Sequence, residues 1–252
     1  MKNSHCNGLI RKQVPRYRKG AWETIDDVVS DERRLTIVWR DDLTGEHGRA
    51  VLWSWPHDLA PLALGHVLLD ILPQGDTLLR QCSVAQSADN EYAVTLGRMR
   101  VRQEHAPLSG ISGGVLFRAM HAFIMAASRW DGTGCFHQAG VFDPDSGRFP
   151  ARAEDIGRHN CLDRLAGWSA MHCAPLAGTI LFTSARITAS FCAKAARAGF
   201  HILVSRSAVT SAAIALAEER NLSLIGFART DEERFTLFAD PQGRIRLEEH
   251  CP

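Results

Sequence analysis

Short apolar runs alternate with amphipathic stretches in the second half of the chain. The runs have the length and composition of buried strands, and they are TILFTS (179–184), HILVS (201–205) and LSLIGFA (222–228). The stretches between them, 188–199 and 209–221, repeat their apolar residues at helical spacing. Strands that alternate with helices of this length indicate βαβ units and a parallel or mixed sheet.

The flanks of this series predict the remaining elements of the same half. We expect strands at 135–142 and 234–238 and helices at 115–130 and 155–168. The turn DPDSG closes the first of these strands. The predicted fold class is α/β in this half of the chain.

The first half has a different order of elements. Residues 35–55 predict two strands around a polar turn, which is a hairpin pattern. Apolar residues at helical spacing follow over 57–72, with Asp58 as the expected N-cap, and strand-like stretches lie near 78–87 and 91–101. Strands, a helix and further strands predict a small α+β unit.

A domain boundary is expected near residue 108, just before the glycine-rich loop SGISGG (109–114). Residues 1–108 would then form the small α+β domain, and 109–252 the α/β domain. Several cations gather at the start of the chain, and we expect them to form an unordered arm, because terminal segments are commonly poorly ordered. They are Lys2, Arg11, Lys12, Arg16, Arg18 and Lys19.

Composition narrows the class of protein. The 252 residues are 45% hydrophobic and 23% charged with a formal net charge of +1, which is ordinary for a globular protein and gives no overall field for nucleic acid or a membrane surface. The longest apolar run, around AFIMAA, is too short to cross a bilayer, and no apolar stretch follows the basic start as in a secretory signal. We therefore expect a cytoplasmic protein with neither nucleic acid nor a membrane as partner.

The cysteines argue against disulfides and zinc. All seven stand singly, and no CxxC occurs. Zinc deaminases need H-x-E and P-C-x-x-C, whereas His137 is followed by Gln138 and Ala139. We expect no zinc. Cys135 and His137 could form a nucleophile and a base, although alternation along a strand is more typical of packing.

Four polar segments fall where a βαβ sheet binds ligands. They are TGCFH (133–137), EDIGRHN (154–160), TSAR (183–186) and FARTDEER (227–234). In such sheets ligands bind beyond the carboxyl ends of the strands, where helix N-termini point. We expect the four segments to meet there.

The segment 154–160 is the most informative of the four. Asp155 is expected to cap the helix, while Arg158 and His159 offer donors at a helix start that already favours anions. The alternative is purely structural, with Asp155 as a cap and Arg158 paired with Glu154.

Ser184 and Arg186 repeat the arrangement at the next helix. Two arginines and a histidine at helix starts suit phosphates or a nucleotide. His137, from the first segment, would line the same site. No one of these motifs is specific, so the structural and the ligand-binding interpretations both stay open at this point.

Several of these motifs also resemble one known family. TGCFHQAGVF, EDIGRHNCLDRLAG, the whole stretch from LFTSAR to LIGFAR, and RFTLF look like the FdhD/NarQ family of formate dehydrogenase accessory proteins. PHDLAPLALGHVLLDIL resembles that family's N-terminal helix. The likeness spans roughly residues 35 to 240 and is dense from 133 onward.

The resemblance implies a fold and a cargo. The fold is a cytidine-deaminase-like C-terminal domain, a mixed sheet with flanking helices and no zinc site, usually in a homodimer. The cargo is the molybdenum cofactor as bis-molybdopterin guanine dinucleotide. The family's cofactor-binding stretch falls on Phe227, Ala228, Arg229, Thr230, Asp231 and Glu232.

The glycine-rich loop departs from the family. Its members carry C-G-x-C here, and a cysteine takes sulfur from a cysteine desulfurase as a persulfide and passes it to the cofactor. This chain has Ser109 and Ser112 at the two positions, and a serine hydroxyl forms no persulfide. Ser112 is expected to cap the next helix. Ser190 and Asp70 are further departures, because the family usually has glutamate at both positions.

The sequence therefore predicts an accessory protein for formate dehydrogenase maturation that binds this cofactor and aids its sulfuration or insertion. Its partners would be the catalytic subunit of the dehydrogenase and a cysteine desulfurase. Three interpretations stay open: a non-enzymatic carrier, a sulfurtransferase that uses another thiol such as Cys135, and an unrelated nucleotide-processing enzyme.

Overall fold

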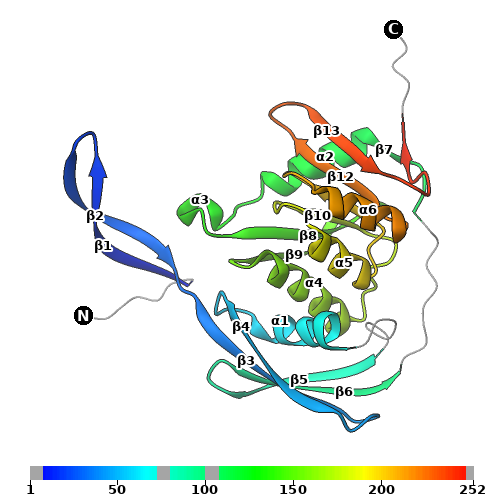
Figure 1. Ribbon diagram of the computed structural model, residues 1–252, viewed down its shortest axis with the longest axis horizontal. Helices are drawn as coiled ribbons and strands as arrows, with labels where there is room; N and C mark the ends of the chain where they lie inside the picture. The colour runs from blue at the N-terminus through cyan, green and yellow to red at the C-terminus, as the bar shows by residue number, and fades with distance from the viewer. Residues whose placement is uncertain (1–7, 73–79, 100–107, 248–252) are drawn as a thin grey trace.

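A computed structural model describes residues 8–72, 80–99 and 108–247 of the chain. Its centre is a six-stranded sheet in the order β13-β12-β11-β10-β8-β9 (Figure 1). Strands β9 to β12 run parallel, and β8 and β13 run against them. The strands are β8 (His137–Asp143), β9 (Arg148–Asp155), β10 (Ile180–Thr183), β11 (Ile202–Ser205), β12 (Ser223–Arg229) and β13 (Arg234–Ala239).

Helices cover both faces of this sheet, so the central strands are apolar on both sides. Helices α4 (Arg158–His172), α5 (Ala189–Arg197) and α6 (Ser211–Glu219) form a core with one face. Helix α2 (Gly113–Ile124) forms a second core with the other face, and the short α3 (Trp130–Thr133) follows it. The expected mixed α/β fold is confirmed.

The N-terminal part is a four-stranded sheet in the order β4-β3-β6-β5. Helix α1 (Leu59–His66) and the π-helical turn η1 (Val67–Ile71) pack on it, and their apolar residues form a third core with it. The strands are β3 (Arg33–Asp41), β4 (His47–Ser54), β5 (Arg80–Ala88) and β6 (Glu91–Met99). The predicted hairpin at 35–55 is confirmed as β3 and β4. The domain boundary near 108 stays a prediction.

The expected N-cap position of Asp58 is confirmed, but its side chain makes no capping hydrogen bond. Its backbone has a left-handed φ of 49°, a conformation unlike the extended one of an ordinary N-cap. The carbonyl of Asp58 instead accepts a hydrogen bond of 2.6 Å from Arg164.

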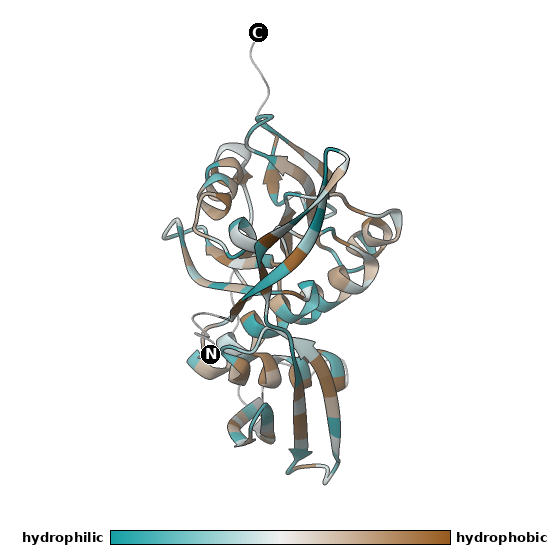
Figure 2. Ribbon diagram, turned by 90° about the vertical axis from the view of Figure 1, so that its left-hand side faces the viewer, coloured by the Kyte–Doolittle hydropathy of each residue, from teal (hydrophilic) through white to brown (hydrophobic). Residues whose placement is uncertain are grey.

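The expected unordered basic arm is wrong for the cations from Arg11 to Lys19, and Lys2 lies outside the described residues. Residues 9–30 form an antiparallel hairpin of β1 (Leu9–Arg18) and β2 (Ala21–Ser30), which projects from the body in Figure 1. Lys19 and Gly20 both have positive φ, 50° and 85°, as the two central residues of a type I′ hairpin turn do. In Figure 2 the hairpin crosses in front of the main body and alternates polar and apolar colours.

Acidic residues in the second strand explain why this basic segment is ordered. The register places Arg16 opposite Glu23 and Lys12 opposite Asp27, and the first pair forms a salt bridge of 2.7 Å. Opposite charges directly across two strands stabilise their pairing. The cations alone predicted a disordered arm, whereas the anions that follow them along the chain pair with them. Strand β9 was not predicted either, and neither were the two very short strands β7 (Ile111–Ser112) and β14 (Ile245–Arg246), which pair in parallel.

Helix α1 crosses α4 at backbone contact. A Cβ atom on Gly65 would lie 1.8 Å from the carbonyl oxygen of Asp163, and one on Gly167 would lie 1.9 Å from that of Pro61. These two glycines therefore let the helix of the N-terminal part touch the helix beside the main sheet. Within the described residues, no helix is long and apolar enough to cross a membrane.

Four ionisable groups close the same interface. Lys194 Nζ lies 2.6 Å from Asp70 Oδ2 and 2.8 Å from Asp163 Oδ1, and His66 Nδ1 lies 2.9 Å from Asp70 Oδ2. Burial lowers the pKa of His66, but hydrogen bonds to both carboxylates outweigh burial and raise this pKa to about 9. His66 and Lys194 in turn hold the pKa of Asp70 well below its usual range, against the effect of burial.

Replacing Gly167 with alanine should destabilise the protein. The added Cβ must push α1 away from α4, and overpacking of this kind typically costs about 1–3 kcal/mol. The measurement is the urea midpoint of unfolding. Gly132→Ala is the matched control, because nothing lies within 4 Å of a Cβ built there. Equal midpoints for the two variants would contradict the close contact.

Stability should fall as pH rises through about 9. A pKa raised from 6.5 means that His66 contributes stability that is fully present below pH 6.5 and is lost as pH passes the folded value. The urea midpoint of His66→Gln should therefore decline less over this range than that of the wild type. His47→Gln, at an exposed position, is the control. The same decline in wild type and His66→Gln would refute the role of His66.

Candidate functional site

The four polar segments meet at one edge of the six-stranded sheet, as expected. Strands β9, β10 and β12 end at this edge, and the antiparallel strands β8 and β13 begin there. The register places His137 opposite Asp155 and Ala139 opposite Thr183. Helices α4, α5 and α6 follow β9, β10 and β11, so their N-termini start at the same edge.

A cluster of three basic side chains, His137, Arg158 and Arg186, stands where β8 begins and β9 and β10 end. His137 is half-buried, and burial followed by the positive charges of Arg158 and Arg186 lowers its pKa. Arg186 is exposed, whereas Nε of Arg158 is buried and has no hydrogen-bond partner among the described residues. A buried donor without a partner is costly, so this position favours an incoming acceptor.

Asp155 has a different role from the expected one. It is fully buried, and its Oδ2 accepts hydrogen bonds of 2.9 and 2.6 Å from Arg164. Its Oδ1 accepts from Gly157 N at 3.0 Å and from Asn160 Nδ2 at 2.9 Å. The N-cap of α4 is Gly157, and no side chain caps the helix, so the capping role of Asp155 is wrong. Asp155 comes two residues too early and lies at the end of β9.

The structural alternative for Arg158 is wrong as well. Glu154 does not pair with Arg158; it forms an ion pair with Arg129 and accepts a hydrogen bond of 2.8 Å from Ser128. Arg158 is left without a carboxylate among the described ion pairs. This outcome favours the ligand-binding interpretation of the helix start.

His159 points toward the start of α5. Its Nε2 lies 3.4 Å from Ser190 Oγ, and its ring centroid lies 5.8 Å from that of Phe191. Burial, followed by the charges of Arg158 and Lys194, lowers the pKa of His159. His159 therefore stands between the starts of two helices and is a neutral polar group near pH 7.

Hydrogen bonds tie together the ends of β10, β11 and β12. Ser184 Oγ accepts from Gln138 N at 2.9 Å. Ser207 Oγ donates to the carbonyl of Ser184 at 2.8 Å, and Phe227 N donates to the carbonyl of Ser207 at 3.0 Å. Ser207 thus links Ser184 to the stretch 227–232.

The end of β11 was not among the four polar segments predicted from the sequence. Ser207 and the exposed Arg206 directly follow β11. The signal was present, because an apolar run is followed at once by a small polar residue and an arginine. The same pattern ends β10 at Ser184 and Arg186.

The stretch 227–232 begins at an irregular point of β12. The pairing with β13 shifts register between Gly226 and Arg229, and Phe227 has a left-handed φ of 50°. A bulky residue in this conformation is an outlier of the kind that clusters at binding sites. The side chain of Ala228 is buried in the core, so only its backbone is open to a ligand.

Two guanidinium groups lie near the ring of Phe227. The guanidinium carbons of Arg229 and Arg234 are 5.7 and 5.6 Å from the centroid of its ring. Glu232 pairs with both arginines and keeps them in place. Thr230 and Asp231 form the turn that follows, where Asp231 and Glu232 are exposed.

Comparisons with known proteins agree with this arrangement. The sequence pattern of the FdhD/NarQ family matches residues 93–246. A "Sulfur carrier protein FdhD" from Bacillus pumilus is 37% identical over 94% of this chain and 98% of that protein. The chain belongs to the FdhD/NarQ family. "Protein FdhD" from Methanocaldococcus jannaschii is 40% identical, over 45% of this chain and only 50% of that protein.

A solved structure supports the fold of this FdhD/NarQ member. It is the crystal structure of a Desulfotalea psychrophila protein described as a formate dehydrogenase accessory protein. The TM-score is 0.76, at 21% sequence identity, and the match covers 94% of this chain and 99% of the other. At this identity the likeness shows the fold.

The glycine-rich loop with Ser109 and Ser112 lies beside β13 and pairs with β14. Ser112 caps α2 as expected, since its Oγ accepts from Val115 N at 3.3 Å. A Cβ built on Gly113 would lie 3.2 Å from the ring of Phe235, one residue after the start of β13. The loop with Ser109 and Ser112 therefore adjoins the hairpin that carries Arg229 and Arg234.

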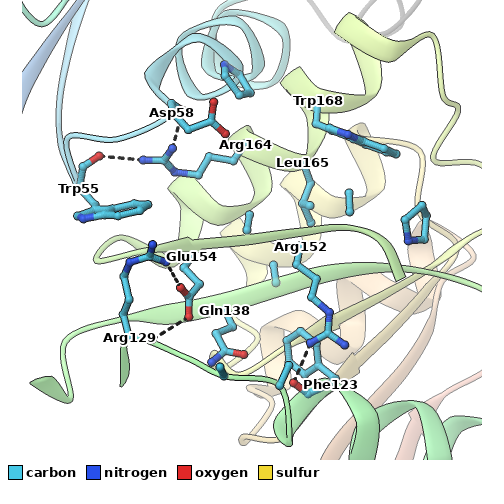
Figure 3. A pocket seen from close by; sticks show the side chains of 17 residues that line it. Trp55, Asp58, Phe123, Arg129, Gln138, Arg152, Glu154, Arg164, Leu165 and Trp168 are labelled. Carbon is cyan, nitrogen blue, oxygen red and sulfur yellow. Dashed lines mark hydrogen bonds and ion pairs between the residues drawn. The ribbon is translucent and has the colours of Figure 1, made fainter. Parts of the chain in front are cut away.

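Cys135 and a separate hollow are further features of the surface near the sheet. Cys135 is exposed just before β8, at the same sheet edge as His137. A hollow of about 500 Å³ lies elsewhere, along β9, and its lining includes Trp55, Arg152 and Trp168 (Figure 3). Because the cationic residues of the sheet edge do not line the hollow, we treat the two as separate features.

The pKa of His137 should rise when its cationic neighbours are removed. In Arg158→Gln with Arg186→Gln, burial still lowers this pKa, but the repulsion between like charges is gone. A titration followed by NMR of the histidine rings measures the shift. The signal of the exposed His172, at the far end of α4, should not move. An unchanged pKa of His137 would contradict the proximity of Arg158 and Arg186 to its ring.

Proposed function

We propose that this chain is an accessory protein for formate dehydrogenase maturation. It binds the molybdenum cofactor as bis-molybdopterin guanine dinucleotide at the cationic edge of the sheet and holds this cargo for sulfuration or insertion. The names of two similar proteins support an accessory role: one is called a sulfur carrier protein, and the other is described as a formate dehydrogenase accessory protein. Its partners are then the dehydrogenase catalytic subunit and a cysteine desulfurase, and its working form is a homodimer.

The observation that carries the proposal is the buried Nε of Arg158, which has no partner among the described residues. Arg158 also lies close enough to His137 for its positive charge to lower the pKa of that histidine. Arg186 and Arg206 are exposed at the neighbouring strand ends, and neither forms a salt bridge within the described part of the chain. Guanidinium groups bind phosphate through paired hydrogen bonds, so this edge suits a pyrophosphate.

Helix starts add to the same attraction. The N-caps of α4, α5 and α6 are Gly157, Thr188 and Thr210, and all three helices start at this edge. The free N–H groups of a helix start, together with its dipole, favour negative charge. The pyrophosphate of the dinucleotide would therefore meet donors from both side chains and backbone.

The stretch 227–232 suits the guanine base. Phe227 offers a half-buried aromatic ring with Arg229 and Arg234 close to it. Bases stack on aromatic rings and on guanidinium planes, with about 1–3 kcal/mol for each stacked base. Asp231 and Glu232 carry carboxylates that can accept from the N–H groups of guanine, which would distinguish this base from adenine.

The serines of the glycine-rich loop favour a cofactor carrier over a sulfurtransferase. Passing sulfur through a persulfide needs a thiolate that attacks the sulfane sulfur and releases the desulfurase thiolate. Ser109 and Ser112 cannot form this bond. We therefore infer a carrier that holds the cofactor while another protein supplies the sulfur. The second candidate is a sulfurtransferase through Cys135, which its exposure at the cationic edge favours.

Titration with GDP tests the binding site. The wild type should bind with a Kd in the micromolar range, and Arg158→Ala or Arg186→Ala should weaken binding about tenfold or more, because a charge-assisted hydrogen bond contributes about 1.5–3 kcal/mol. Arg148→Ala is the matched control, since Arg148 begins β9 at the opposite edge of the sheet. Unchanged affinity in both site variants would remove these residues from the site.

Sulfur-35 transfer from a cysteine desulfurase separates the two candidates. The carrier predicts no label on the wild type, and normal dehydrogenase activity in cells with Ser109→Ala and Ser112→Ala. The sulfurtransferase predicts label on the wild type that disappears in Cys135→Ala. Cys173→Ala, at another exposed cysteine, is the control for nonspecific labelling. Label that depends on Cys135 would overturn the carrier.

A further inference from the structure

We propose that the groove along the free edge of β9 docks an extended, acidic segment of a partner protein. The segment would add a strand to the six-stranded sheet at its open side. The groove is separate from the cationic edge, and the proposal does not rest on cofactor binding.

The backbone of β9 has unpaired groups on its outer side. Strand β9 is the last in the sheet order, and among the described strands it pairs with β8 alone. Gln138 is bonded to Ser184 through both its N–H and its carbonyl, at 2.9 and 3.0 Å, so it faces β10. In an antiparallel ladder alternate residues face opposite neighbours, so Ala139 faces β9 and its partner Ala153 faces β8. The N–H and C=O groups of Arg152 and Glu154 therefore point outward.

Apolar side chains flank this open edge on both faces of the sheet. Figure 3 shows Trp168 on one side of the strands and Phe123 on the other. The hollow between them measures about 500 Å³. It exists because small residues line it, and these are Ala126, Ala127, Ala139, Ala151 and Ala153. An added strand would have room for side chains on both faces.

Arg152 gives the groove its charge preference. Its guanidinium donates to the carbonyls of Phe123 and Ala122, both at 3.1 Å, and lies 4.3 Å from the ring centroid of Phe149. The other two arginines of the lining have their own carboxylates. No carboxylate within the described ranges forms a salt bridge with Arg152. An acidic side chain of the partner would supply this missing charge.

The same charge argues against a second copy of this chain as the occupant. Two β9 strands paired about a two-fold axis would bring Arg152 close to Arg152 of the other copy. Like charges opposite each other destabilise strand pairing. A register shift between Arg148 and Ala151, with Pro150 inside it, also disrupts the start of the strand. Docking is therefore confined to the stretch from Ala151 to Asp155.

The probe is a short capped peptide of alternating glutamate and valine, added to the full chain. It should bind, and amide hydrogen exchange at Arg152 and Glu154 should slow when it does. A peptide of lysine and valine, and a glutamate peptide methylated at each backbone nitrogen, should bind about tenfold more weakly, because one lacks the charge and the other lacks the strand donors.

Charge reversal keeps the test independent of folding. Arg152→Glu should lose affinity for the glutamate peptide and gain affinity for the lysine peptide, which a misfolded variant would not do. Arg148→Glu, on the same strand outside the groove, should leave both affinities unchanged. Equal binding of the charged peptides, binding of the methylated peptide, or no binding would overturn the proposal. Concentration-dependent protection of these amides without peptide would also overturn it, and would make a second copy the occupant.

Discussion

The guanidinium of Arg164 holds the two parts of the molecule and the candidate site in one arrangement. It is 5% exposed and donates to both Asp155 Oδ2 and the carbonyls of Trp55, His57 and Asp58. The side chain of Arg164, in α4, therefore connects the end of β9 to the chain segment before α1. Removing one partner of a buried pair leaves an uncompensated charge, which costs about 3–5 kcal/mol.

This constraint also shapes the cationic edge. The carboxylate of Asp155 is paired with Arg164, so it does not pair with Arg158, which lies three residues after Asp155 in the sequence. Arg158 then faces His137 and the neighbouring strand end with an unused donor. Two positions at which the family resemblance led us to expect glutamate lie close by: Ser190 contacts His159, and Asp70 pairs with Lys194.

Periodicity was enough to predict most of the main sheet, and it failed where charge, backbone conformation or short side chains decide. The other strands and the helices from β8 to β13 were predicted because each is buried or amphipathic over several residues. Strand β9 was missed, because its buried positions are Ala151, Ala153 and Asp155, which give a weak apolar signal. The hairpin of β1 and β2 was missed because its order depends on pairs such as Arg16 with Glu23, which only the register reveals. Asp155 was assigned to the wrong role because it stands two residues before the N-cap Gly157 and is the buried ion-pair partner of Arg164. The strand end at Arg206 carried the same signal as its neighbours and could have been predicted.

The claim at the centre of this account is that the cationic edge holds a guanine dinucleotide as cargo. Mass spectrometry of the small molecule that co-purifies with the native protein, from cells that make the molybdenum cofactor, tests it most directly. The account predicts the molybdopterin guanine dinucleotide on the wild type and its loss from Arg158→Ala with Arg186→Ala. No bound nucleotide on the wild type, or a cofactor that both proteins retain equally, would contradict it.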